Sequence, residues 1–270
     1  GSGSVDSLRA VAVFVEITFA ARAPRVISLA YGVPRAMNLP GSAAVRSTWT
    51  AMQNGPQPDE YPVSEAIGEP IVYATLPPDW LSACHLRTRT TVAGQVAGMI
   101  YFDEFFLGAG QTATNNSDTV INYLTDREPW LFDRALTLFG AYVRTGDVTW
   151  LRHAHRAAQF YARHVGVDGY FDLAAGDGKY AYGQSMWVDE MFTGDNTLVS
   201  KIEAVAAAHV GWEAVYAPSS NFWTERHQAY ALLGALSAWE ATGSSAHATR
   251  VRQVAQGTFA AALTPPDITS

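Results

Sequence analysis

The sequence predicts a mainly α-helical protein with an N-terminal β-region, in which the helices form repeated hairpins. Residues 5–95 alternate between apolar and polar positions with a period of two, which is typical of strands. From residue 126 onward the period becomes helical. There, Thr-Gly-Asp or Thr-Gly-Ser turns recur at Thr145, Thr193 and Thr242, which are separated by 48 and then 49 residues.

The N-terminal part is predicted to be a small antiparallel β-region over residues 5–95. Proline-containing and glycine-containing loops separate its short alternating runs. The predicted strands are Val11–Phe19, Val26–Val33, Pro70–Leu76 and Leu86–Val92. Residues 1–4 have the composition of a cloning scar, residues 96–125 are predicted to connect the two halves, and residues 265–270 form a tail.

Each turn fits the corner of a helical hairpin in the region 126–264. Its glycine can take the left-handed conformation that ends a helix, and the following Asp or Ser can cap the next helix. The helices before the turns are apolar almost all round, which indicates burial; they are Trp130–Arg144, Ala181–Phe192 and Glu225–Ala241. The helices after the turns, such as Val148–His164 and Ala246–Ala261, carry more polar residues and are expected to form an outer layer. An inner and an outer row are the arrangement of an α/α toroid or a helical solenoid.

Composition limits the classes of partner. Apolar residues make up 48% of the chain and charged residues 16%, so a sizeable core can form. The net charge of −7 and the lack of a long basic cluster argue against nucleic acid. The sequence has no apolar run long enough for a membrane span, so we expect a soluble protein, compatible with secretion or a periplasmic location. The oligomeric state is left open.

Polar and aromatic residues gather at the starts of the three inner helices. They are Trp130, Asp133 and Arg134 in the first hairpin, Lys179, Tyr180, Tyr182 and Gln184 in the second, and Trp223, Glu225, Arg226 and His227 in the third. Packed helices lie roughly 8–10 Å apart, so stacked hairpins would bring these side chains along one groove. Rings that stack on sugar faces and charged groups that bond hydroxyls suit a carbohydrate.

The segments Trp130–Arg134, Lys179–Gln184 and Phe222–His227, each followed by a turn of this type, resemble the hairpins of α/α-toroid carbohydrate-active enzymes. That group includes glycoside hydrolases and polysaccharide lyases, and the resemblance covers about half of the chain. It implies an enzyme that cleaves glycosidic bonds of a polysaccharide or oligosaccharide. A closed toroid of this kind has six hairpins, so we expect an incomplete ring or part of a longer enzyme.

Two chemistries fit these residues, and hydrolysis is slightly favoured. Asp133 and Glu225 would supply the acid and the base or nucleophile of a hydrolase. For β-elimination, Tyr182 or His227 would remove a proton while Arg226 neutralises a uronate carboxylate. The substrate-binding residues would be Trp130, Arg134, Lys179, Tyr180, Gln184, Trp223 and Arg226. The alternative is a non-catalytic helical-repeat module that binds carbohydrate or protein.

Other polar residues are predicted to be structural. Asp133 would then pair with an arginine, and Glu225 would cap its helix. His153, His155 and His164 are not expected to bind metal, because residues two apart on a helix point to different sides and no Cys or paired carboxylate completes a site. No metal and no cofactor are predicted. Asp189 and Glu190 precede the second turn, on the face opposite the groove, and are expected to be solvated.

Overall fold

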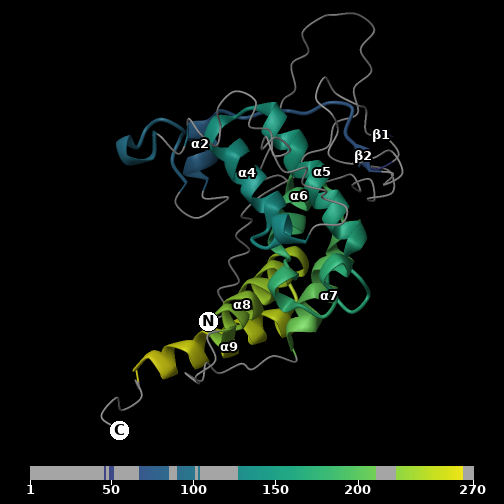
Figure 1. Ribbon diagram of the computed structural model, residues 1–270, viewed down its shortest axis with the longest axis vertical. Helices are drawn as coiled ribbons and strands as arrows, with labels where there is room; N and C mark the ends of the chain where they lie inside the picture. Colours follow the sequence, from purple (N-terminus) through teal and green to yellow (C-terminus); the bar gives the residue numbers. More distant parts are fainter. Residues whose placement is uncertain are drawn as a thin grey trace, which may run out of the picture.

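The computed structural model describes residues 46, 49–51, 67–84, 90–100, 103, 127–210 and 223–263, with the backbone alone for residues 99, 223–225 and 260–263. This part of the chain is mainly helical (Figure 1). Its α-helices are α2 (Pro78–Ala83), α4 (Arg134–Thr145), α5 (Val148–His164), α6 (Gln184–Thr193), α7 (Thr197–Val210), α8 (Trp223–Thr242) and α9 (Ser245–Leu263). Short 3-10 turns lie at η2 (Ala97–Met99), η3 (Glu128–Trp130), η4 (Asp172–Ala174) and η5 (Gly178–Tyr180). None of the described helices is long and apolar enough to cross a membrane.

The three predicted hairpins are confirmed, and their corners are built alike. Gly146, Gly194 and Gly243 have φ angles of 68°, 70° and 68°, in the left-handed region that glycine adopts without strain. In each corner the preceding threonine hydroxyl donates to the carbonyl four residues back, at 2.6–2.8 Å. The same hydroxyl accepts the amide of the residue after glycine. Threonine therefore ends one helix and orients the chain toward the next.

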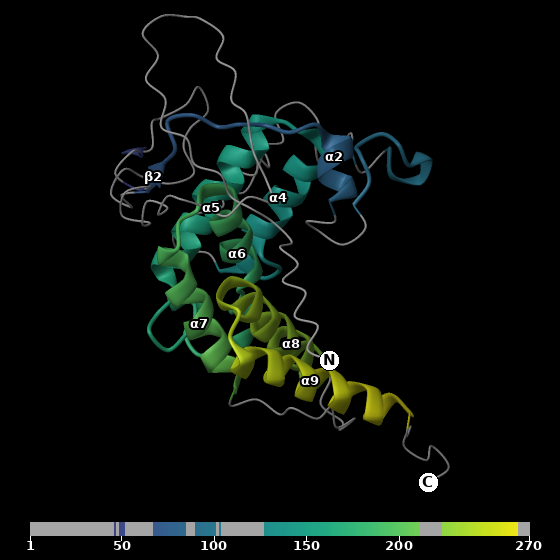
Figure 2. The same cartoon turned by 180° about the vertical axis from the view of Figure 1, so that it is seen from behind.

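The hairpins α4–α5, α6–α7 and α8–α9 follow one another along the molecule (Figures 1 and 2). Helix α6 packs against both α4 and α8, so the first helices of the three hairpins form a continuous row. Helix α5 also contacts α6, and α7 contacts α8. The contact between α7 and α8 is close, since a Cβ added to Gly234 would lie 2.4 Å from Nδ1 of His209.

Aromatic side chains fill the core between the first two hairpins. The Phe139 ring on α4 stacks on Phe192 of α6 with 5.7 Å between centroids. Trp130, which precedes α4, stacks on Phe160 of α5 at 5.2 Å and is only 1% exposed. Packing of these large side chains joins the hairpins into one hydrophobic core.

The predicted β-region is wrong for most of its described part. The described strands are β1 (Thr50–Ala51) and β2 (Gly68–Glu69), which pair antiparallel. Residues 70–76 are irregular, and residues 78–83 form helix α2, which packs on α4. Pro78 occupies the first helical position, where a missing N–H is harmless, and Asp79 lies in the first turn. The predicted strands at 11–19 and 26–33, and residues 86–89 of the fourth, lie outside the described residues.

Helix α5 is not the exposed outer helix that its polar residues suggested. Its His155, Arg156 and Gln159 side chains are all buried. Strand β2 lies beside α5 (Figure 1), and its Gly68 carbonyl and Glu69 carboxylate bond His155 and Arg156. The polar residues on α5 therefore meet partners in the protein instead of water.

Candidate functional site

The structure brings the starts of the three inner helices together, as predicted. The Tyr182 hydroxyl donates toward the backbone carbonyls of Leu131 and Lys179. The Tyr182 ring packs edge-on against Tyr230 of α8, with 5.5 Å between centroids. We define the hairpin-start cluster as Phe132, Asp133, Asp177, Lys179, Tyr182, Arg226, His227 and Tyr230.

Tyr182 has a structural place in this cluster. Its side chain is buried, and burial raises the pKa of its hydroxyl far above the ordinary value of a tyrosine, with the charge of neighbouring Asp133 adding to the effect. The hydroxyl proton is directed at backbone carbonyl oxygens. A proton-abstracting base needs the opposite, a lowered pKa and access to substrate. Tyr182 thus links the three hairpin starts, and its predicted role as a base is corrected.

Asp133 caps helix α4. Its Oδ1 accepts the amide of Leu136 at 3.1 Å, and its side chain is buried. Its φ of 52° makes it the one non-glycine residue with positive φ in the described part of the chain. Aspartate tolerates this left-handed conformation better than most residues, and such outliers gather at functional sites. Asp133 therefore lies in the cluster but already accepts a hydrogen bond within the fold.

Two predicted sugar-binding aromatic residues lie in the core. Trp130 is 1% exposed and Tyr180 4% exposed, so neither ring offers a face to a ligand. The backbone carbonyl of Tyr180 accepts the hydroxyl of Tyr161 at 2.6 Å, and that hydroxyl also accepts the Tyr182 amide at 2.8 Å. The predicted sugar-binding roles of Trp130 and Tyr180 are therefore wrong. An aromatic ring at the start of a helix can pack in the core as readily as it can bind a sugar, and the sequence does not distinguish the two.

The exposed part of the cluster combines an aromatic ring with positive charge. Phe132 is 68% exposed, and the guanidinium carbon of Arg226 lies 5.7 Å from its ring centroid. Lys179 pairs with Asp177, with 3.1 Å between Nζ and Oδ2. This surface suits a ligand with one apolar face and several polar groups.

His227 is half-buried beside these charges. Burial lowers the pKa of its imidazole, Lys179 and Arg226 lower it further, and Asp177 opposes them. The ring is therefore neutral at neutral pH and able to accept a proton. Of the three predicted catalytic residues whose side chains are described, His227 has the surroundings that best fit a base.

Four further predicted site residues lie at the starts of the inner helices. Arg134 and Gln184 are half-buried at the first positions of α4 and α6. Trp223 and Glu225 begin α8, but their side chains lie outside the described residues. The predicted pairing of Asp133 with Glu225 therefore stays a prediction.

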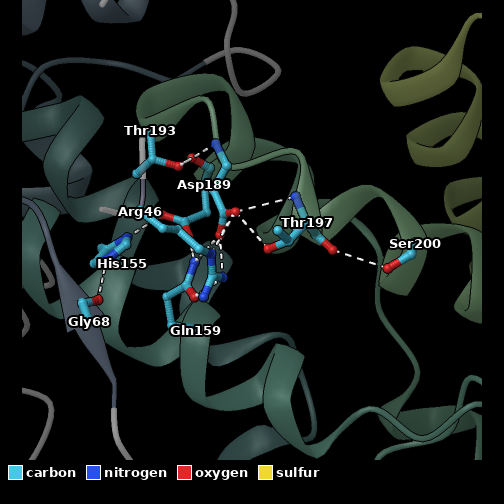
Figure 3. A network of polar contacts seen from close by, with 9 residues as sticks. Arg46, Gly68, His155, Gln159, Asp189, Thr193, Thr197 and Ser200 are labelled. Carbon is cyan, nitrogen blue, oxygen red and sulfur yellow. Dashed lines mark hydrogen bonds and ion pairs between the residues drawn. The ribbon is translucent and has the colours of Figure 1, made fainter. Parts of the chain in front are cut away.

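A second polar cluster was missed by the sequence reasoning. Asp189, expected to be solvated, is fully buried and accepts Nδ1 of His155 at 2.7 Å (Figure 3). Gln159 donates to Asp189 at 2.8 Å and to Asp195 at 3.2 Å. Arg46 completes this part of the cluster with two bonds to Asp195, at 2.8 and 2.5 Å. The expectation for Asp189 failed because its partners are 30 or more residues away in sequence.

Strand β2 extends the same cluster. Glu69 of β2 accepts Arg152 at 2.9 Å and Arg156 at 3.0 Å. Burial acts to raise the pKa of Glu69, but the bonds from Arg156 and Arg152 outweigh it and lower the pKa to about 2. We define the turn network by these charged and polar residues: Arg46, Glu69, Arg152, His155, Arg156, Gln159, Asp189 and Asp195.

One sequence signal could have identified the turn network. Arg152, His155, Arg156 and Gln159 recur at positions i, i+3, i+4 and i+7, so they share one face of a helix. A polar stripe of this width on a helix faces either solvent or buried carboxylates of another segment. The choice between them depends on segments distant in sequence.

Within the described residues, no group of three or more His, Cys, Asp or Glu side chains gathers as metal ligands would. No protein-family model matches the chain, and no curated protein or solved structure is significantly similar to it. The functional assignment therefore rests on the geometry of the hairpin-start cluster.

Proposed function

We propose that this chain is a carbohydrate-active protein that binds a polysaccharide or oligosaccharide at the hairpin-start cluster and cleaves its glycosidic bonds. The observation that carries the proposal is the convergence of three hairpin starts beside an exposed ring with a guanidinium over it. The proposed fold type is an α/α toroid, supported by the row formed by α4, α6 and α8.

Each exposed group has a role that its chemistry supports. The Phe132 ring would stack on the apolar face of a sugar. Lys179 and Arg226 would form charge-assisted hydrogen bonds to hydroxyl or carboxylate oxygens. Because both side chains are positively charged, acidic saccharides should be tested as ligands alongside neutral ones.

Hydrolysis is slightly favoured over β-elimination, because two residues with carboxyl groups, Asp133 and Glu225, occur at the hairpin starts. Elimination would need a base, and the raised pKa of Tyr182 leaves His227 for that role. Hydrolysis would use Asp133 and Glu225 as the two carboxyl groups. Ligand binding would then have to draw Asp133 away from its capping bond to Leu136.

The capping bond of Asp133 also supports the second candidate, a helical-repeat module that binds saccharide without cleaving it. In that case Asp133 and Tyr182 keep their structural hydrogen bonds, and the exposed ring and cations alone make the binding surface. The two candidates share the ligand surface and differ in turnover.

The test is incubation of the protein with neutral and acidic polysaccharides. A hydrolase releases reducing ends, and a lyase also gives the ultraviolet absorbance of an unsaturated product. Binding without either product favours the module. The absence of both binding and turnover across the panel would overturn the proposal.

Phe132→Ala and Arg226→Gln are expected to weaken saccharide binding by about tenfold each, with little change in stability. Matched controls come from α9, outside the cluster. Phe259 is 69% exposed, against 68% for Phe132, and Arg252 is exposed. Phe259→Ala and Arg252→Gln should bind as the parent does, and equal losses in both pairs would contradict the assigned surface.

A further inference from the structure

His155 has an oxygen acceptor at each ring nitrogen. Its Nδ1 lies 2.7 Å from Oδ1 of Asp189, and its Nε2 lies 3.1 Å from the carbonyl oxygen of Gly68 (Figure 3). A neutral imidazole has one N–H and can satisfy one of these acceptors, whereas an imidazolium has two. Since the side chain is only 1% exposed, water does not replace a missing donor. The geometry therefore calls for a protonated ring.

This histidine joins segments that are distant in sequence. Gly68 belongs to β2, Asp189 to α6, and His155 itself to α5. The ring also packs edge-on against Trp49 and Tyr73, with 5.1 and 6.3 Å between centroids. His155 thus helps to hold the segment around β2 to the first two hairpins, together with the bonds from Arg152 and Arg156 to Glu69.

We propose that His155 is a proton-dependent clasp that holds residues 67–73 against α5 and α6 while it is charged and releases them when it loses its proton. Loss of the proton takes the His155 donor away from either Oδ1 of Asp189 or the Gly68 carbonyl, although Gln159 still donates to Oδ2 of Asp189. An unmet buried acceptor favours separation of the two segments.

The charged groups around the ring come from every packed element. Asp189 faces it from α6, Glu69 and Tyr73 from the β2 segment, and Arg152 and Arg156 from α5 itself. Beyond Gln159 lie the bonded pair Arg46 and Asp195, and Glu190 follows Asp189 on α6. Two buried carboxylates, Asp189 and Glu69, therefore act on this cation, and a third, Asp195, lies beyond Gln159.

The direction of the pH effect follows from these neighbours. Burial acts to lower the pKa of His155, but Asp189, the Gly68 carbonyl and Glu69 outweigh it and raise the pKa above 6.5. The contribution of His155 is fully present below pH 6.5 and is lost as the pH rises through the raised pKa. Glu69 acts oppositely, since its contribution is present above pH 4.5 and is lost as the pH falls toward about 2. Docking of residues 67–73 is therefore strongest in mildly acidic solution.

The test is hydrogen exchange of peptides covering residues 67–73, read by mass spectrometry from about pH 6 to about pH 9 and corrected for intrinsic rates. Protection is expected to fall by up to about tenfold per pH unit between pH 6.5 and the raised pKa, because one proton is lost on release in that range, and to level off at higher pH. The readout involves no saccharide, so its failure leaves the proposed function untouched.

His155→Gln should abolish this pH dependence, because glutamine does not titrate. His164→Gln is the matched control, since His164 pairs with Asp172 at 2.8 Å on the same helix but at a more exposed place. This control should keep the pH dependence of the parent. Protection that is independent of pH in the parent, or unchanged pH dependence in His155→Gln, would overturn the proposal.

A second measurement holds even where His155→Gln does not fold. The imidazole resonances of the parent protein, followed by NMR over the same pH range, report the charge of each ring directly. The His155 ring is expected to keep its charge to a pH above 6.5. A ring that is already neutral at pH 6.5 would overturn the clasp.

Discussion

The two polar clusters of this molecule contain similar residues in opposite conditions. The turn network buries His155 and Asp189 to 1% and 0% exposure, and their polar atoms meet protein partners. The hairpin-start cluster instead leaves Phe132 exposed and His227 half-buried beside Lys179 and Arg226. Removing one partner of a buried ion pair leaves the other charge uncompensated and destabilises the fold, whereas charged groups that reach solvent can contact a ligand.

We expect the two clusters to respond differently to substitution. Substitutions in the turn network should change stability, and substitutions on the exposed surface of the hairpin-start cluster should change ligand binding. Tyr182 lies between these cases, because it belongs to the hairpin-start cluster but is buried and hydrogen-bonded. Three variants test the forecast, in order of decreasing effect on stability.

Asp189→Ala is expected to lower the free energy of unfolding by about 3–5 kcal/mol, because it leaves buried His155 without its charge partner. Urea denaturation followed by circular dichroism measures this. Asp172→Ala is the control: Asp172 pairs with His164, its side chain is 56% exposed, and its loss should change stability by about 0–1 kcal/mol. A similar small loss for both variants would remove the distinction between the clusters.

Glu69→Gln is expected to lower the free energy of unfolding at neutral pH by about 3 kcal/mol, because the pKa of Glu69 falls from 4.5 to about 2 on folding. This contribution is lost as the pH falls through that range, so the variant should lose less stability than the parent between pH 4.5 and about 2. Thermal unfolding over a pH series measures both effects.

Glu203→Gln is the control for Glu69→Gln. The Glu203 carboxylate is 50% exposed and lies 3.9 Å from His247, so its change should leave the acid limb close to that of the parent. If the parent and Glu69→Gln lost stability equally as the pH fell from 4.5 to about 2, Arg152 and Arg156 would not be lowering the pKa of this carboxylate.

Tyr182→Phe is expected to lower the free energy of unfolding by about 1 kcal/mol, because it removes the hydroxyl that donates to backbone carbonyls. Any turnover found with the saccharide panel should fall by less than about tenfold, whereas loss of a catalytic base removes roughly 10²–10⁴-fold. A drop in that larger range, with unchanged stability, would restore Tyr182 as a catalytic residue.

Local signals made the helical half predictable. A left-handed glycine after threonine, followed by Asp or Ser, encodes a corner within four residues, and all three corners formed. The wrong prediction around Pro78 also came from a local signal. A proline between two alternating runs predicts a loop between strands, but Pro78 occupies the first position of helix α2. The turn network could not be found this way, because the partners of His155 lie 34 and 87 residues away.

The sequence by itself determined where helices end and turn, because those choices depend on φ angles and on bonds between near neighbours. It also placed polar and aromatic residues at three equivalent helix starts. Only the tertiary structure decided which of them reach solvent: Trp130 and Tyr182 are buried in the packing, and Phe132 is exposed. The tertiary structure also buried Asp189, which lies near the other end of its helix. Whether a residue is buried depends on which distant segment packs over it, and the neighbouring residues in the sequence do not specify that contact.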